Sequence, residues 1–199
     1  MSIMKAERAG QWTLTEAAKL LGEPQHRLIY LCEKGVIRPD FQDAEGRGSS
    51  RRFSARNLLE FAVALRLREF EIQVSLIAAV IHVLRAFDDS MRKKIKAFQL
   101  PDSVRIGKAP DLRAIISDEQ CLYFSLRMGS APAKVFGGVA LGDLERMEAA
   151  GFSSRRELRI PEIRHSSQTL SEFGAPEGSK HARVEISITK IAQDLPLED

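Results

Sequence analysis

The chain has 199 residues, of which 44% are hydrophobic and 29% are charged, values ordinary for a globular protein with room for two small domains. No apolar run approaches the ~20 residues that span a bilayer, and the N-terminal segment lacks the apolar core of a signal peptide, so we expect a cytoplasmic protein without membrane contacts. The net charge of +3 is too small to establish a nucleic-acid partner, so its distribution matters.

The positive charge is concentrated in the N-terminal part of the chain. Between Lys19 and Arg68 there are ten Lys or Arg against six Asp or Glu, whereas from Lys96 to the end there are fourteen against fifteen. Binding to a phosphate backbone requires a local positive excess of this kind. The excess is weak evidence alone, because a run of charge is usually a solvated surface.

Two short helices around a tight turn are predicted within residues 13–34. Thr13 is a capping residue before apolar residues at helical spacing, and the turn sequence 22–24 (GEP) interrupts them. The second helix covers residues 25–34, with Leu28 and Leu31 on its packing face, and Gly35 ends it. This is a helix-turn-helix layout, in which the second helix reads base edges in DNA.

A basic, turn-rich segment follows the second helix. In residues 40–50, two glycines flank Arg47, and Arg51 and Arg52 then lead into Phe53. We expect a two-stranded hairpin, or wing, that carries arginines to a phosphate backbone or a minor groove. Ser54 is a suitable N-cap for the helix that follows.

The motifs in this region resemble one known family. They are Leu14 to Ala18, Tyr30, Lys34 to Pro39, Gly46 to Ser54, and Asn57 with Leu58. Together they resemble the N-terminal winged helix-turn-helix domain of the MerR (mercury-resistance regulator) family. The chain departs from that family at Ile29, where an Arg usually precedes an aromatic pair, and its long dimerising helix is predicted to be cut short here.

The resemblance implies a bacterial transcriptional regulator that binds promoter or operator DNA as a homodimer and realigns the promoter for RNA polymerase. Such a protein would be associated with the nucleoid. The residues expected to contact DNA come from the two helices, the segment after them and the wing: Thr15, Gln25, His26, Arg27, Tyr30, Lys34, Arg38, Arg47, Ser49, Ser50, Arg51 and Arg52.

Further elements complete the expected α+β fold, a mainly helical winged helix-turn-helix domain followed by a small α+β domain. Helices are predicted over 54–67 and 75–87, then a separate short helix over 88–99. Strands are predicted over 112–116, 121–128, 134–141 and 183–189, with a helix over 142–150 and a loop over 165–180. The expected domains are 12–87 and 111–199, joined by a short helix and linker, 88–110.

The second half of the chain carries no convincing enzyme signature. The glycine-containing segment 174–180 lacks the spacing of a phosphate loop, and no acid is placed to orient His165 beside Ser166 or Cys121. The two cysteines, Cys32 and Cys121, form no metal-ligand cluster. We therefore expect no catalytic residue, no metal and no cofactor.

Three functional hypotheses remain open. The first is a sequence-specific DNA-binding regulator whose C-terminal half senses an unidentified small-molecule effector or mediates dimerisation. The second is an excisionase-like or architectural DNA-binding protein without an effector. The third is a protein-interaction module on the same fold, and a salt titration separates it from the others, because phosphate contacts weaken steeply with salt.

Overall fold

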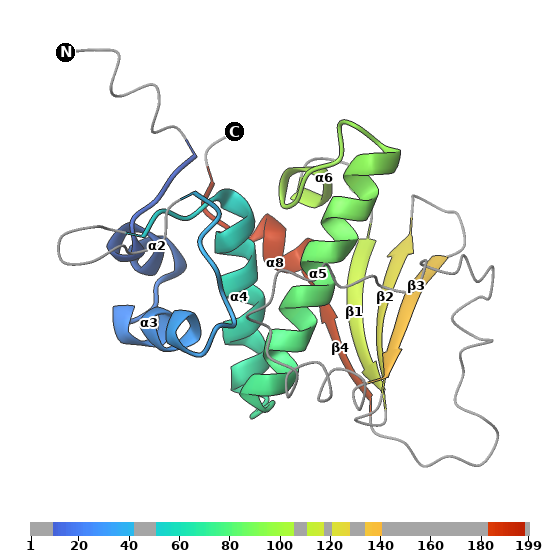
Figure 1. Ribbon diagram of the computed structural model, residues 1–199, viewed down its shortest axis with the longest axis horizontal. Coiled ribbons are helices and arrows are strands. Elements are labelled where there is room, and N and C mark those ends of the chain that lie inside the picture. The colour runs from blue at the N-terminus through green and yellow to red at the C-terminus, as the bar shows by residue number, and fades with distance from the viewer. Residues whose placement is uncertain are drawn as a thin grey trace. The chain divides into compact units, whose positions relative to one another are not determined.

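The computed structural model describes residues 10–41, 51–105, 111–117, 121–127, 134–140 and 183–197. Within these ranges the chain combines helices with a four-stranded sheet (Figure 1), which confirms the α+β class. The chain divides into two compact units, Met1–His82 with Asp194–Asp199, and Val83–Gln193. In the described parts, no helix is both long enough and apolar enough to cross a lipid bilayer.

The helices of the first unit begin within about one residue of the positions expected from the sequence. Its helices are α2 (Leu14–Leu21), α3 (Gln25–Glu33), α4 (Ala55–Glu69) and the first part of α5 (Val74–Lys94). Gly22 after α2 and Gly35 after α3 have φ of 66° and 70°. Each closes a Schellman motif, in which Glu23 N–H donates to Ala18 O and Val36 N–H to Leu31 O. The left-handed backbone that favours glycine therefore makes the tight turn between α2 and α3.

Capping boxes start two of these helices. Thr13 Oγ1 accepts from the N–H of Glu16 at 3.2 Å, and the Glu16 carboxylate accepts from the N–H of Thr13 at 2.7 Å. Ser54 and Asn57 make the same reciprocal pair at the start of α4, at 3.1 and 3.2 Å. Each box satisfies backbone donors that a helix leaves unpaired, which is why α2 and α4 begin there.

Phe53 lies at the centre of the first unit. Its side chain is fully buried and meets the ring of Phe61, on α4, edge to face at 5.2 Å between centroids. Its backbone exchanges two hydrogen bonds with Trp12, at 3.0 and 2.9 Å, and Phe41 N–H donates to Arg52 O at 3.4 Å. Backbone pairing thus brings residues 12, 41 and 51–53 together, while the tip of the expected hairpin falls outside the described residues.

Helix α5 corrects one prediction. It continues through Asp88 to Lys94, so the separate helix expected over 88–99 was wrong. Acidic residues favour the first turn of a helix, and Asp88 and Asp89 follow this pattern in the sequence. Asp88 is instead a buried residue within α5, where it binds Arg92 at 2.8 Å and accepts from the N–H of Leu100 at 3.0 Å.

The second unit contains one antiparallel sheet with strand order β3-β2-β1-β4. The strands are β1 (Asp111–Ser117), β2 (Cys121–Arg127), β3 (Lys134–Ala140) and β4 (Arg183–Ser187). All four predicted strands are confirmed, but the last ends two residues early because α8 (Ile188–Gln193) follows at once. The predicted helix over 142–150 and the loop over 165–180 lie outside the described residues.

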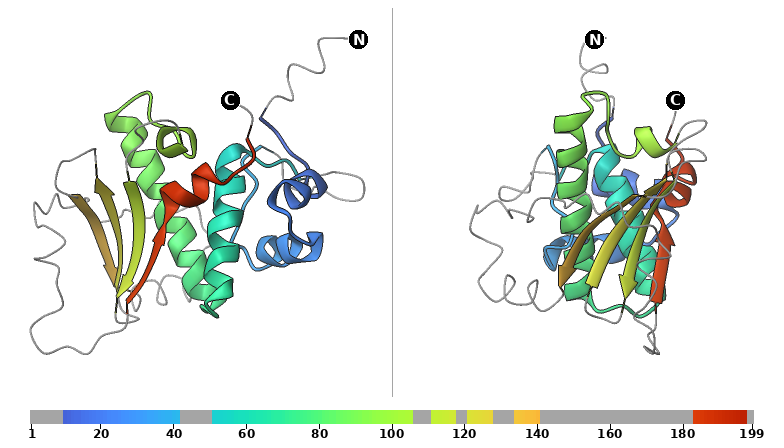
Figure 2. Two further views of the ribbon diagram at one scale, coloured as in Figure 1. Left: turned by 180° about the vertical axis from the view of Figure 1, so that it is seen from behind. Right: turned by 90° about the vertical axis from the view of Figure 1, so that its right-hand side faces the viewer.

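Helices cover one face of this sheet. Helix α8 packs on β1 and on α6 (Asp102–Arg105), and the second half of α5 lies on the same side (Figure 2). Leu112, Ala114 and Ile116 alternate along β1 and are buried on one face, and Ile115, on the opposite face of the strand, is buried too. Thr189 Oγ1 accepts from the N–H of Leu112 at 2.8 Å and fixes the start of α8 to the start of β1.

Charged residues along β2, β1 and β4 pair with one another. Asp111 binds Arg113 and Arg127, each at 2.9 Å, and Arg113 also binds Glu185 on β4 at 2.7 Å. Partial burial raises the pKa of Asp111, but the hydrogen bonds and charges of Arg127 and Arg113 outweigh burial and hold it below its usual range. The hydrogen bond to Glu185 is the main reason why the pKa of Arg113 is raised.

Candidate nucleic-acid interface

One exposed row of side chains runs along α3. His26, Tyr30 and Lys34 follow one another at intervals of four residues, so they share one side of the helix, and all three are exposed. Leu28 and Leu31, which point elsewhere around the helix, are 0% and 1% exposed. The packing face and the outward face of α3 are therefore those predicted from the sequence.

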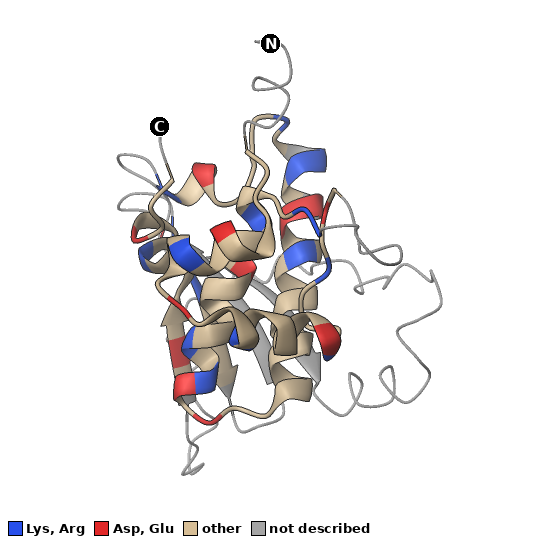
Figure 3. Ribbon diagram, turned by 90° about the vertical axis from the view of Figure 1, so that its left-hand side faces the viewer, with Lys and Arg blue, Asp and Glu red and all other residues tan. Residues whose placement is uncertain are grey.

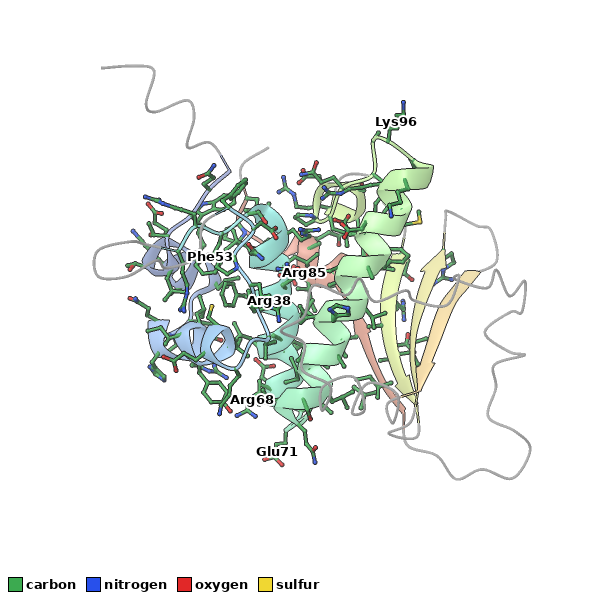
Figure 4. All side chains as sticks on the ribbon, viewed as in Figure 1. Arg38, Phe53, Arg68, Glu71, Arg85 and Lys96 are labelled. Atoms are coloured by element: carbon green, nitrogen blue, oxygen red, sulfur yellow. The ribbon has the colours of Figure 1, made fainter. Side chains whose placement is uncertain are left out.

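Two cations flank the ring of Tyr30. Lys34 Nζ lies 5.7 Å from the ring centroid, and the Arg68 guanidinium, from α4, lies 5.9 Å from it. Both distances are within the range of a cation–π contact. Neither Lys34 nor Arg68 forms an ion pair with any residue that the structure describes. We call Tyr30, Lys34 and Arg68 the cationic cluster; Figure 4 shows Arg68 at the end of α4.

Sequence reasoning missed Arg68. Arg68 lies 38 residues after Tyr30 in the sequence and was not among the residues expected to contact DNA. The contact arises because α4 packs against α3, and nothing in the local sequence pattern encodes that packing. Its neighbour Arg66 is paired with Glu69 at 2.6 Å, so two arginines on one helix turn have different electrostatic environments.

The start of α3 is connected to its surroundings by two polar contacts. Thr15, exposed on α2, donates its hydroxyl to Gln25 Oε1 at 3.3 Å. Arg27 forms an ion pair with Glu23 in the preceding turn, at 2.6 Å, with 39% of the Arg27 side chain exposed. Three residues predicted to contact DNA, Thr15, Gln25 and Arg27, therefore make contacts at the start of α3, but Arg27 already has an acidic partner.

A fully buried amide joins the segment after α3 to the start of α4. Asn57 Oδ1 accepts from the N–H groups of Asp40 and Ser54, at 2.9 and 3.2 Å. Its Nδ2 donates to the carbonyl of Arg38 and to Glu60 Oε2, both at 2.9 Å. The predicted contact residue Arg38 is exposed, and its backbone is held by this amide.

The Asp40 carboxylate strengthens the same connection. It accepts from the hydroxyl of Ser54 and from two nitrogens of Arg56, at 3.1 and 2.9 Å. A bidentate Arg–carboxylate pair has a fixed geometry as well as a favourable energy. Arg51 and Arg52, which are half-buried, immediately precede this anchored region.

Not every predicted contact residue can be placed. Arg47, Ser49 and Ser50 lie outside the described residues. Over the described ribbon, basic and acidic residues are interspersed (Figure 3), so the charge is not of one sign. Within the described ranges, no three His, Cys, Asp or Glu side chains are grouped closely enough to hold a metal ion.

Comparisons with known proteins assign no family or function to this chain, so the argument rests on its residues. No known protein family matches the sequence in a scan, and a search of curated proteins also finds no match.

Proposed function

We propose that residues 12–87 form a winged helix-turn-helix domain that binds double-stranded DNA sequence-specifically, as in the MerR-like regulators that the N-terminal motifs resemble. The observation that carries this proposal is the exposed row on α3 with two cations over Tyr30. A cation over an aromatic ring keeps its charge, whereas a carboxylate partner would neutralise it. The cationic cluster is therefore suited to bind anionic groups, and phosphates are the anions that DNA presents.

The two ends of α3 are suited to different parts of the duplex. An α-helix fits the major groove, and residues at the start of a recognition helix usually contact bases. Gln25 and His26 lie at that end, and the hydrogen bond from Thr15 restrains the Gln25 amide. In this proposal they read base edges, while Lys34 and Arg68 bind phosphates and set the orientation of the helix.

Arg27 has a conditional role in the proposal. The ion pair between Arg27 and Glu23 is partly exposed, and such pairs contribute modestly to stability, so a phosphate can replace Glu23 as the partner of Arg27 at a modest cost. Arg38, Arg51 and Arg52 would supply further phosphate contacts beside α3. Arg47, Ser49 and Ser50 belong to the proposed wing by the sequence pattern alone.

The resemblance extends the proposal to a transcriptional regulator that binds a two-fold-symmetric operator as a homodimer. RNA polymerase is then a partner at the promoter. The second unit would serve as an effector-sensing or dimerising part. The number of chains bound per operator tests the homodimer directly.

The test is a titration of the full-length protein on DNA from its own upstream region, with scrambled DNA of equal length as the control. We expect site-selective binding of two chains per site that weakens steeply between about 50 and 200 mM salt, a range over which proteins with several phosphate contacts lose orders of magnitude in affinity. Binding of both DNAs with equal, weak affinity would instead favour the architectural alternative. No salt-sensitive binding to either DNA would overturn the proposal and favour a protein-interaction module.

A further inference from the structure

Asn57 has all of its hydrogen-bonding capacity in use. A side-chain amide has two donors and two acceptor positions, and in Asn57 all four are occupied at 2.9–3.2 Å. The residue is 0% exposed, so none of these interactions is shared with solvent. Removing any partner would leave a buried polar atom unsatisfied, which proteins avoid because of its cost. The geometry around Asn57 is therefore closely determined.

The groups that Asn57 binds lie on both sides of the proposed wing. Arg38 and Asp40 belong to the segment that leaves α3, and their carbonyl and N–H groups are held by the two ends of the amide. Ser54 belongs to the segment that returns to α4, and its N–H is held by the same Oδ1. One side chain thus fixes the spacing between two segments that are far apart in sequence.

Three arginines predicted to bind phosphates depend on this spacing. Arg38 is bound directly through its backbone, and Arg52 and Arg51 precede Ser54 by two and three residues. Arg52 is also held between the Phe41 N–H, which donates to its carbonyl at 3.4 Å, and the anchored backbone of Phe53. Groups that are already ordered lose less conformational entropy on binding, so a fixed spacing favours simultaneous binding of several phosphates.

We propose that Asn57 is a positioning residue for DNA binding, which acts by holding Arg38 on one side and Arg51 with Arg52 on the other at the spacing of phosphates in one duplex. The inference rests on the proposed function. Asn57 is buried and uncharged, so neither its exposure nor its charge would suggest that it contributes to DNA affinity. Asn57 itself does not touch DNA.

The decisive variant combines Asn57→Asp with Glu60→Gln in the full-length chain. The new carboxylate at position 57 can still accept from Asp40 and Ser54, and the new amide at position 60 can donate to it. The donation to the Arg38 carbonyl is abolished, and two acceptors face each other instead. Glu60→Gln alone is the matched control, because Asn57 then keeps a partner at position 60 and its bond to Arg38.

The measurement is the slope of log affinity against log salt concentration for DNA from the protein's upstream region, at a temperature where circular dichroism shows each variant folded. We expect the double variant to reduce the slope by about 0.9 for each arginine that no longer binds a phosphate, and the control to keep the wild-type slope. A merely structural role would lower the melting temperature without changing the slope. If the double variant does not fold, Arg56→Gln loosens the same connection at the Asp40 carboxylate, with the same expectation.

A second comparison tests whether Asn57 acts through the arginines. In a background with Arg38, Arg51 and Arg52 all replaced by Ala, the double variant should cause no further change in slope, because coupled residues are not additive. A full additional decrease in that background, or an unchanged slope in the wild-type background, overturns the inference and leaves the proposed function standing. Wild-type protein without salt-sensitive binding overturns the proposed function, and the inference with it.

Discussion

Two groups of basic residues, one in each unit, have different partners. On the sheet of the second unit, Arg113 and Arg127 bind Asp111, and Arg113 also binds Glu185, at 2.7–2.9 Å. In the first unit, Lys34 and Arg68 flank an aromatic ring. The sheet arginines are paired with carboxylates, whereas Lys34 and Arg68 form no ion pair with any residue that the structure describes. They differ in this from Arg27, Arg56 and Arg66 of the same unit, which do have acidic partners.

This comparison indicates where an anion can bind. A phosphate at the sheet would have to displace carboxylates from a network whose hydrogen bonds already lower the pKa of Asp111. A phosphate at the cationic cluster would displace no carboxylate of the described residues, and the ring of Tyr30 would continue to hold both cations in place. Net charge cannot make this distinction, because it counts paired and unpaired cations equally.

Replacing both cations of the cluster should have the largest effect. We expect Lys34→Gln with Arg68→Gln to reduce the salt slope of DNA binding by about 1.8, which corresponds to two phosphates. Because hydrogen bonds to charged groups contribute about 1.5 kcal/mol each, the affinity should fall about a hundred-fold. A titration at three salt concentrations measures both quantities.

Two paired arginines are the controls for this variant. Arg66→Gln removes a charge from the same helix turn as Arg68, and Arg113→Gln removes one from the sheet, but both residues are bound to carboxylates. Each should leave the salt slope unchanged. An equal decrease for Arg66→Gln would mean that total charge matters and that the cationic cluster has no special role.

Removing the ring of Tyr30 should have a smaller effect. Each exposed cation–π interaction contributes about 0.5–1 kcal/mol, so removing both in Tyr30→Leu should lower the DNA affinity about ten-fold. Tyr30→Phe keeps the ring and should lower the affinity much less. If the two variants have the same reduced affinity, the hydroxyl of Tyr30 is the important group, and the ring does not position the cations.

The ion pairs of Asp111 on the sheet should contribute to stability in a pH-dependent way, and their loss should leave DNA binding unaffected. The folded pKa of Asp111 is held below its ordinary value of 3.8, so its contribution to stability is present above that value and is lost as the pH falls through the folded pKa. Asp111→Asn should therefore lower the free energy of unfolding at pH 7 by at most about 1 kcal/mol, since the network is partly exposed.

The acid dependence distinguishes this contribution from a general loss of packing. Below about pH 4, the difference in stability between wild type and Asp111→Asn should shrink, because protonation removes the same interaction in the wild type. Urea titrations between pH 3 and pH 7 measure it. A constant difference in stability over this range would show that the charge of the Asp111 carboxylate does not contribute. A changed salt slope of DNA binding in Asp111→Asn would contradict the expectation that the paired arginines of the sheet do not bind DNA.

The parts of the fold that sequence could predict are those encoded by neighbouring residues. Thr13 and Ser54 cap helices, Gly22 and Gly35 end them, β-forming residues mark β1 and alternating residues mark β4, because each signal acts within one element. The continuation of α5 past residue 88 was missed for the opposite reason. Arg92 lies four residues after Asp88 and is a local partner, but the N–H of Leu100, which also donates to this carboxylate, lies twelve residues away, and a local rule about acidic helix starts does not include it.

The same distinction applies to the candidate interface. The outward face of α3 followed from its periodicity, so His26, Tyr30 and Lys34 could be predicted. Arg68 could not, because only the packing of α4 on α3 brings it to Tyr30. The partner of Arg27 lies four residues away and was within reach of a helix-pair rule, but Glu23 had been considered only as part of the turn.

The smallest expected effect concerns Glu71, which follows Arg68 at the end of α4 (Figure 4). It has a φ of 58°, and its N–H donates to the carbonyl of Arg68 at 3.0 Å, so it takes the place that glycine has after α2 and α3. A left-handed conformation costs a residue with a side chain about 1–2 kcal/mol, part of which is offset because glycine gains freedom in the unfolded chain. Glu71→Gly should therefore stabilise the protein by about 0.5–1 kcal/mol.

Glu71→Ala separates this strain from charge. It removes the same carboxylate near the cationic cluster but keeps the strained backbone, so it should not raise the melting temperature. Both variants should strengthen DNA binding slightly and equally if repulsion between Glu71 and phosphate opposes it. A gain in affinity for Glu71→Gly alone would mean instead that backbone conformation at the end of α4 positions Arg68, and the contrast between the units would then depend on rigidity as well as on charge.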